Sequence, residues 1–203
     1  MPSTNDTNLL LGKELRLRNY LRNLGSAVLA FSGGVDSALL AYLAWQEMGD
    51  KFTAITVDSP LLSESDLAES VHFCSSYGIP HLVIEMPILE NALFSANDDL
   101  RCYYCKQTIF SLLFNYARDH EILHVLDGTN IEDSPARRPG MRVLVEAGIS
   151  SPLRFAAMKK ADIRLLSKQL DLPTWNKESA ACLATQIPSF SPITYESLLE
   201  IRQ

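Results

Sequence analysis

The chain has 203 residues, a formal net charge of −6 and a hydrophobic fraction of 47%, values that suit one ordinary globular domain. The acidic balance argues against broad nucleic-acid binding, which needs a basic face, and favours a small-molecule substrate. The polar N-terminus lacks the architecture of a signal peptide, and no apolar run approaches the ~20 residues of a membrane-spanning helix. We therefore expect a cytoplasmic protein with reduced thiols and no membrane attachment.

Apolar, β-branched runs alternate with amphipathic segments along the chain. Helices are predicted over residues 9–24, 37–48, 64–77, 104–119 and 159–170, and strands over residues 26–31, 52–57, 81–85 and 122–126. Four alternations of strand and helix predict βαβ units, and hence an α/β fold with a doubly wound parallel sheet. Ligands bind such sheets at the carboxyl ends of the strands, so the informative residues should follow each strand directly.

The most informative segment is a Ser-Gly-Gly-Val-Asp-Ser string between the first strand and the helix that follows it. Gly33 and Gly34 permit a sharp turn and close approach to a ligand, while loop amides and the helix N-terminus point at an anion. Ser32 and Ser37 add hydroxyl donors, and the carboxylate of Asp36 suits a Mg²⁺ ion held against phosphates. A plain capped turn is the alternative, but the whole string favours an ATP site.

Polar residues also follow the second and fourth strands. Asp58 ends the second strand, where it is either a nucleotide contact or a simple cap. After the fourth strand, Gly128 permits close backbone approach, and we expect the side chains of Thr129 and Asn130 to face the nucleotide. Arg138, one of two adjacent arginines, either stabilises charge developing on a phosphate or belongs to a solvated loop.

Three of the four cysteines lie in unusual surroundings. Cys102 and Cys105 are three residues apart, so a helix places them on one face. Cys182, flanked by small residues, is the natural third thiol. Three cysteines fall short of a structural zinc site but can hold a [4Fe–4S] cluster with one iron left open. The alternative is a set of unrelated thiols, which is our interpretation of Cys74, a residue among apolar neighbours.

Residues 30–37 resemble the pyrophosphate-binding loop of the N-type ATP pyrophosphatases, the PP-loop superfamily. Its members include amidating synthetases for GMP, NAD and asparagine, and tRNA-thiolating enzymes. Within it, the chain is most similar to the LarE-like ATP-dependent sulfur transferases, which help to build the nickel-pincer nucleotide cofactor. The similar segments are residues 30–37, 101–106, 127–130, 138–140, 146–153, 174–177 and 181–183.

This resemblance implies an adenine nucleotide alpha hydrolase-like fold, a Rossmann-like three-layer sandwich. It implies that ATP adenylates a small carboxylate substrate of the pyridinium nucleotide type, that pyrophosphate is released and that sulfur is then delivered. A homo-oligomer is also expected. The residues expected to hold ATP and Mg²⁺ are Ala30, Ser32, Gly33, Gly34, Asp36, Ser37, Asp58, Gly128, Thr129 and Asn130.

We expect Asp36, Arg138 and Cys182 to be catalytic. In one branch of the LarE-like enzymes a single cysteine, which matches Cys182, loses its sulfur and becomes dehydroalanine. The other branch has three cysteines that carry a [4Fe–4S] cluster, and these match Cys102, Cys105 and Cys182. The resemblance therefore places this chain in the cluster branch, with either a cluster-bound sulfide or the Cys182 thiolate as the sulfur nucleophile.

The chain departs from the family pattern in two ways. Gln186 stands where the family has an arginine, so a fixed positive charge is lost. We expect residues 1–190 to form the ATP pyrophosphatase domain and residues 191–203 to begin a linker to a C-terminal domain that LarE-like proteins have. The alternative functions are those of an amidating or tRNA-thiolating enzyme of the superfamily, or of a degenerate ATP-binding module.

Overall fold

The structure is a computed structural model that describes residues 4–134, 140–178 and 182–202. Within these residues, four parallel strands form one sheet in the order β3-β2-β1-β4. The strands are β1 (Ala27–Ala30), β2 (Phe52–Asp58), β3 (His81–Glu85) and β4 (His124–Leu126). The predicted doubly wound parallel sheet is confirmed, because β1 lies in the middle and the chain moves outward from it in both directions.

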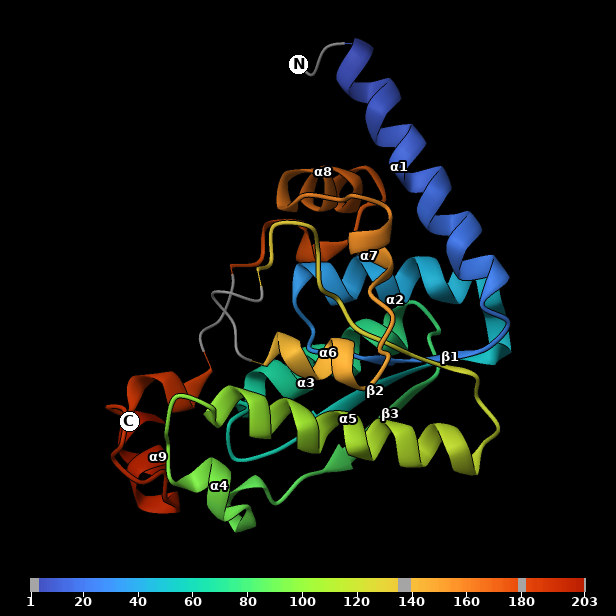
Figure 1. Ribbon diagram of the computed structural model, residues 1–203. Coiled ribbons are helices and arrows are strands. Elements are labelled where there is room, and N and C mark those ends of the chain that lie inside the picture. Colours follow the sequence, from blue (N-terminus) through green and yellow to red (C-terminus); the bar gives the residue numbers. More distant parts are fainter. Residues whose placement is uncertain (1–3, 135–139, 179–181, 203) are drawn as a thin grey trace.

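Helices precede, connect and follow these strands (Figure 1). The α-helices are α1 (Thr4–Asn23), α2 (Val35–Met48), α3 (Glu64–Ser76), α4 (Ala92–Ser95), α5 (Arg101–Asp119), α6 (Met141–Glu146), α7 (Pro152–Phe155), α8 (Lys160–Gln169) and α9 (Tyr195–Arg202). Short 3₁₀ turns are η1 (Gly49–Lys51), η2 (Ile88–Glu90), η3 (Pro173–Asn176) and η4 (Leu183–Gln186). The five long helices were predicted, whereas α4, α6, α7 and α9 are too short to show a 3.6-residue period.

One face of the sheet is covered by α1, α2, α3, α7 and α8. Ala27 and Leu29 of β1 point to this face and are fully buried against these helices. In Figure 1, α1, α2, α7 and α8 lie above the sheet. Because successive residues of a strand point to opposite faces, the intervening Val28 contributes to a different cluster.

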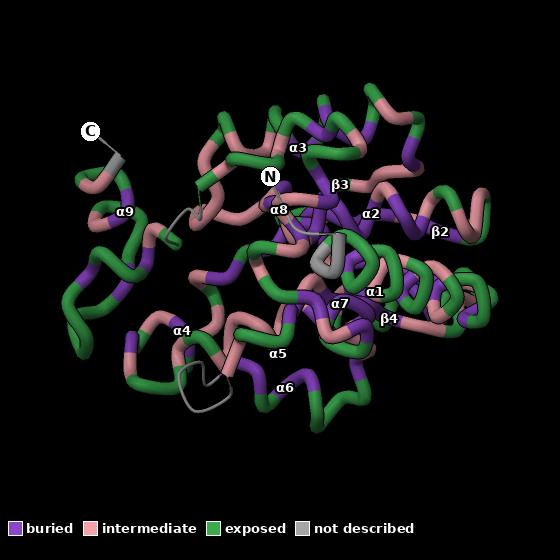
Figure 2. The backbone as a smooth tube through the Cα atoms, turned by 90° about the horizontal axis from the view of Figure 1, so that it is seen from above, coloured by how far each residue is buried: buried purple, intermediate pink, exposed green. Residues whose placement is uncertain are grey.

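The opposite face is covered by α5 and α6. Val28, Ile55 and Val125 come from three adjacent strands and pack against apolar residues of these two helices. Figure 2 shows buried residues along the strands and on the inner sides of the helices. The two clusters make the three-layer arrangement, and they explain why the central strand is apolar on both faces.

A third apolar cluster lies beside the sheet and joins the C-terminal segment, residues 182–201, to the chain that follows β3. Ile193 and Leu198 from the C-terminal segment pack with Met86, Ile88 and Phe94. Figure 1 shows this segment, drawn in red, next to α4. Residues 191–203 were expected to begin a linker, and Ile193, Leu198 and Ile201 of this range pack against the body through this cluster.

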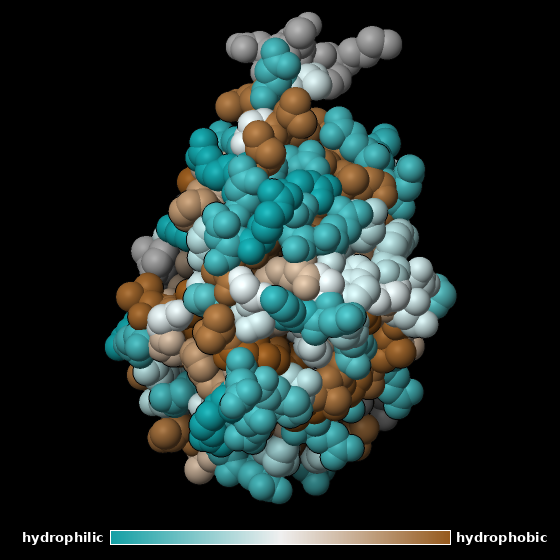
Figure 3. Space-filling view, turned by 90° about the vertical axis from the view of Figure 1, so that its right-hand side faces the viewer, coloured by the Kyte–Doolittle hydropathy of each residue, from teal (hydrophilic) through white to brown (hydrophobic). Residues whose placement is uncertain are grey.

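The surface formed by α1 carries small groups of hydrophobic residues among hydrophilic ones (Figure 3). Leu9, Leu11 and Leu15 of α1 are exposed. Among the described residues, none of the helices combines the length and the apolar character needed to cross a lipid bilayer.

Candidate functional site

The loop after β1 forms a tight turn against the start of α2. The hydroxyl oxygens of Ser32 and Ser37 lie 3.0 Å apart, and the Ser37 hydroxyl donates to the Gly34 carbonyl at 3.1 Å. Gly33 has a φ of +67°, and a Cβ atom there would collide with the hydroxyl of the buried Ser70 on α3. Glycine is therefore required at this position by both backbone conformation and space.

The carboxylate of Asp36, in the first turn of α2, is the electrostatic centre of this loop. Lys160 Nζ lies 2.8 Å from Asp36 Oδ2, and Asn130 Nδ2 donates to the same oxygen at 3.3 Å. The other oxygen, Asp36 Oδ1, is buried and has no hydrogen-bond partner among the described residues. A buried carboxylate oxygen left without a donor suits a cation, so the loop fits the predicted Mg²⁺ ion in its donor chemistry.

Lys160 was not predicted from the sequence. It opens α8, and its backbone N–H donates to Glu132 Oε2 at 2.7 Å. Its side chain is about one-third exposed, and its ammonium group lies beside the loop, where a phosphate would meet a positive charge. No local pattern marks it, because it is separated from Asp36 by 124 positions along the chain and only the tertiary fold brings the two together.

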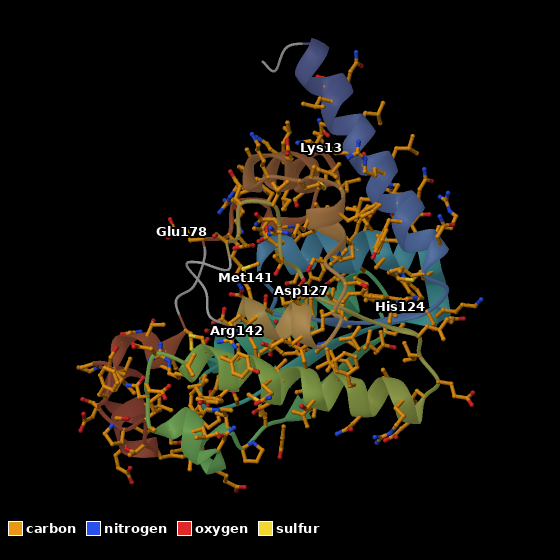
Figure 4. All side chains as sticks on the ribbon, viewed as in Figure 1. Lys13, His124, Asp127, Met141, Arg142 and Glu178 are labelled. Atoms are coloured by element: carbon orange, nitrogen blue, oxygen red, sulfur yellow. The ribbon has the colours of Figure 1, made fainter. Side chains whose placement is uncertain are left out.

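The end of β4 lies directly against the loop. A Cβ atom on Gly128 would lie 3.2 Å from the backbone nitrogen of Ser37, so the close approach predicted for Gly128 is an approach to the loop. The Thr129 hydroxyl donates to Asp127, whose other oxygen accepts from Ser151 at 2.5 Å. In Figure 4, Asp127, which follows β4, lies near the middle of the molecule, and His124, the first residue of β4, lies toward its right-hand side.

Asn130 and Thr129 thus have different surroundings, although both were expected to face the nucleotide. Asn130 points to Asp36, whereas Thr129 is buried and bonded to Asp127. Asp58 is half-buried at the end of β2, and its carbonyl accepts from the Met86 N–H at 2.7 Å. Ala30, the last residue of β1, pairs with a residue of β2 and lies directly before the loop.

Cys102, Cys105 and Cys182 lie close enough for their charges to interact. Burial is the main cause that raises the pKa of the Cys105 thiol to about 12, and the neighbouring thiols of Cys182 and Cys102 contribute to this rise. Burial of the thiol also raises the pKa of Cys182, with Cys102 adding to the effect, although the residue as a whole is exposed. Cys74 is fully buried in the core, away from this group.

The three thiols do not form a ready metal centre. Across residues 4–134, 140–178 and 182–202, no three His, Cys, Asp or Glu side chains are grouped so that they could hold a metal ion. The donors match a [4Fe–4S] cluster in number and kind, but their present spacing does not. Burial, and to a smaller extent the neighbouring thiols, raises the pKa of Cys105, and a bound cation would favour the thiolate instead.

Arg138 falls outside the described residues. Gly140, two residues later, packs tightly against the first turn of α5, because a Cβ atom there would lie 2.8 Å from the Cys102 carbonyl oxygen. The side chain of Lys106 would also be only 3.0 Å away at its Cδ atom. The start of α6 therefore rests on the helical turn that carries Cys102 and Cys105.

Two surface grooves lie away from the pyrophosphate loop. One, of about 650 Å³, runs between α1, α7 and the edge of the sheet and is lined in part by Tyr20, His124 and Phe155. The other, of about 390 Å³, is lined in part by Thr129 and Ser151, two residues that hydrogen-bond to Asp127. Neither groove is lined by Asp36, Lys160 or a cysteine.

Comparison with solved structures gives the same fold. The NH3-dependent NAD synthetase from Campylobacter jejuni superposes with a TM-score of 0.63 at 16% identity, over 87% of this chain and 81% of that chain. The NMN synthetase from Francisella tularensis gives 0.62 at 21% identity, over 84% and 75% of the two chains. At these identities the likeness establishes the architecture alone.

Sequence comparison goes further. The chain is 34% identical over 193 residues to the uncharacterized protein slr1717 of Synechocystis sp., covering 95% of this chain and 72% of that protein. It is 28% identical over 193 residues to the pyridinium-3,5-bisthiocarboxylic acid mononucleotide synthase of Lactiplantibacillus plantarum, covering 95% and 70%. This match confirms the resemblance to the LarE-like enzymes. The model of the NAD synthase family matches residues 11–123, more than half of the chain, and the protein is therefore a member of the NAD synthase family of PP-loop proteins.

Proposed function

We propose that this protein adenylates a small carboxylate with ATP and Mg²⁺, releases pyrophosphate and transfers sulfur to the activated carbon. The observation that carries the proposal is the presence of three electrostatically coupled thiols, Cys102, Cys105 and Cys182, on a PP-loop fold. Amidating relatives deliver nitrogen to the activated carbon and do not need thiols there. The printed name of the Lactiplantibacillus plantarum relative supports a pyridinium mononucleotide as the substrate class.

In the first step, a substrate carboxylate oxygen attacks the α-phosphorus of ATP. The new P–O bond forms as the bond to the bridging oxygen breaks, and its electron pair leaves with pyrophosphate. The backbone amides of the Ser32–Ser37 loop and the start of α2 would hold the leaving pyrophosphate. Lys160 would neutralise charge on it, and Asp36 would hold Mg²⁺ through the oxygen that is now without a donor.

In the second step, a sulfur nucleophile attacks the acyl carbon, the bond to the AMP oxygen breaks and AMP leaves. If Cys182 supplies the sulfur, the product is first a thioester. Removal of the Cys182 Cα proton and cleavage of its Cβ–Sγ bond then leave dehydroalanine and a free thiocarboxylate. The raised pKa of Cys182 means that the thiol needs a base or a cation nearby before it becomes a thiolate nucleophile.

For a [4Fe–4S] cluster, we propose only that Cys102, Cys105 and Cys182 would be its ligands. The spacing of the thiols does not match a bound metal, so no step above depends on the cluster. Anaerobic purification followed by a visible spectrum tests it, because iron–sulfur clusters absorb near ~400 nm. A colourless protein that transfers sulfur would leave Cys182 itself as the source.

The activity test uses MgATP and a pyridinium dicarboxylate mononucleotide, with pyrophosphate and AMP followed by chromatography and oxygen-to-sulfur exchange by mass spectrometry. Cys182→Ala should still release pyrophosphate in the first step but should form no thiocarboxylate. Cys74→Ala is the matched control, because this thiol lies in the core, and it should keep both activities in the folded protein. Sulfur transfer by Cys182→Ala at the wild-type rate would contradict the assigned role.

Amidation is the second candidate, because the family model is that of NAD synthase and two further relatives are GMP synthase subunits. The same assay with an ammonium salt in place of a sulfur source distinguishes the two. AMP release coupled to an amide product would favour amidation. AMP or pyrophosphate release with neither product would leave the acceptor open, and no release at all would favour a nucleotide-binding module. The predicted homo-oligomer stays a prediction, which light scattering can test.

A further inference from the structure

The residue that ties the C-terminal segment to the body is Asn97, in the connection between α4 and α5. It is fully buried and has a φ of +56°. Its side-chain amide nitrogen donates to the carbonyls of Pro188 and Ser191 at 2.9 and 2.8 Å. Its own carbonyl accepts from the Phe190 N–H at 2.9 Å.

Arg101 makes the second connection, from the first turn of α5. Its Nη1 atom donates to Asn97 Oδ1 at 2.5 Å and to the carbonyl of Ala184 at 2.8 Å. Its Nη2 atom lies 4.0 Å from the sulfur of Cys102. One guanidinium group therefore links Asn97, the Cys182-bearing segment and the cysteine pair of α5.

We infer that Asn97 and Arg101 form a clamp that positions Cys182 against Cys102 and Cys105. The clamp grips the segment at Ala184, two residues after Cys182, and again at residues 188–191. Because Cys102 and Cys105 lie on the same helical turn as Arg101, the contacts that hold Ala184 also fix the distance between the thiols. The positioning of Cys182 by this clamp does not depend on the function of the protein, whereas its role in catalysis rests on the proposed sulfur transfer.

The chemistry of Asn97 is specific to this task. Glycine, asparagine and aspartate tolerate a left-handed backbone conformation, which is unfavourable for the other residues. Of these three, asparagine alone offers an uncharged donor group for two carbonyls together with an acceptor for Arg101. Aspartate would place a carboxylate oxygen against the carbonyls of Pro188 and Ser191, and glycine would leave them without a donor.

The test measures thiol proximity directly, under oxygen-free conditions, with the full chain and a short bifunctional thiol reagent. Cross-linked peptides that join Cys182 to Cys102 or Cys105 are identified by mass spectrometry, and their rate of formation is recorded. The variants are Asn97→Asp, Asn97→Gly and Arg101→Lys. Asn91→Asp is the matched control, because Asn91 caps α4 and donates to Thr108 but has no described hydrogen bond to residues 182–201.

We expect cross-linking in all three clamp variants to be slower by roughly tenfold, because an unsatisfied buried polar group shifts a local equilibrium by about that factor. Asn91→Asp, and Arg118→Lys at the exposed far end of α5, should match the wild type. In the activity assay, sulfur transfer should fall in the clamp variants while pyrophosphate release in the first step is retained. A general loss of folding would lower both together.

Clamp variants that fold and cross-link at the wild-type rate would overturn the inference. So would a wild-type protein that gives no cross-link between Cys182 and the pair on α5. If the wild type forms neither AMP nor a thiocarboxylate, the proposed function fails, yet the cross-linking rates still decide whether the clamp positions Cys182.

Discussion

At the scale of single residues, the ion pair of Asp36 and Lys160 uses only one of the two carboxylate oxygens of Asp36. Lys160 and Asn130 satisfy one oxygen of Asp36, and the other oxygen remains buried without a donor. A buried polar atom without a hydrogen-bond partner is costly, so the free oxygen of Asp36 is suited to bind a cation. Removing Lys160 would leave the carboxylate without its opposite charge.

Lys160→Gln should therefore lower the rate of AMP formation by about a hundredfold, because a group that stabilises charge at phosphate commonly contributes that much. Lys159→Gln is the matched control, since Lys159 is the exposed neighbouring lysine on the same helix start. AMP formation is measured for both variants at saturating MgATP. Equal rates in the two variants would show that Lys160 has no part in the chemistry.

Cys74 gives a stability prediction with a defined sign. Burial raises the pKa of its thiol from 9.0 to about 12 in the folded state. Between these values the unfolded chain loses the proton and the folded chain keeps it, so the free energy of unfolding falls as pH rises. The stabilisation is complete below about pH 9 and is lost at up to ~1.4 kcal/mol per pH unit above it.

Cys74→Ala should weaken this dependence, since alanine does not ionise. Urea unfolding at a series of pH values from 8 to 10.5 measures the slope for each protein. Cys105 titrates in the same direction and remains in both proteins, so the expected result is a shallower slope and not a flat line. Identical slopes for wild type and variant would show that Cys74 ionises with its ordinary pKa in the folded protein.

At the scale of elements, buried leucines on one side of α1 attach this helix to the core. Leu17 and Leu21 are fully buried against the sheet-facing core, whereas Leu15 on the same helix is 57% exposed. Ion pairs from Arg18 and Arg22 to Glu47 join α1 to α2 at the surface. Surface ion pairs contribute little, so the buried leucines should dominate the docking of α1.

Leu21→Ala should reduce the free energy of unfolding by about 3 kcal/mol through lost burial and the cavity it leaves. Leu15→Ala, on the same helix, should change it by less than ~0.5 kcal/mol. Chemical denaturation followed by circular dichroism measures both. Comparable losses in the two variants would mean that α1 is not docked as described.

At the scale of the whole molecule, the C-terminal segment is joined to the body by its own apolar cluster and by the clamp of Asn97 and Arg101. Leu198 is 2% exposed in this cluster, and the adjacent Leu199 is 50% exposed. The segment carries Cys182, so its packing bears on the site as well as on stability.

Leu198→Ala should therefore destabilise the protein by about 2–4 kcal/mol if this segment unfolds with the rest. Leu199→Ala should be close to neutral. Thermal and urea unfolding measure the difference, and limited proteolysis shows whether the C-terminal segment opens first. A neutral Leu198→Ala would indicate that the segment does not belong to the cooperative unit.

The long elements and the loop could be predicted because their signals are local. Hydrophobic periodicity marked the helices and strands, and glycines beside a serine and an aspartate marked the turn after β1. The helix that carries the cysteines begins at Arg101, three residues earlier than predicted, and this places Cys102 as well as Cys105 within it. Local propensity sets such boundaries only loosely, because packing against α6 and the C-terminal segment also decides them.

The sequence by itself determined the class of the fold, the pyrophosphate loop and the pairing of Cys102 with Cys105 on one helical face, because each depends on residues that are near one another along the chain. Only the tertiary structure decided that Lys160 meets Asp36, that Gly128 rests on Ser37 and that Asn97 and Arg101 hold the segment bearing Cys182. These contacts join residues far apart in the sequence. Their partners are chosen by the order of the strands and by the way the helices pack, and neither leaves a local pattern.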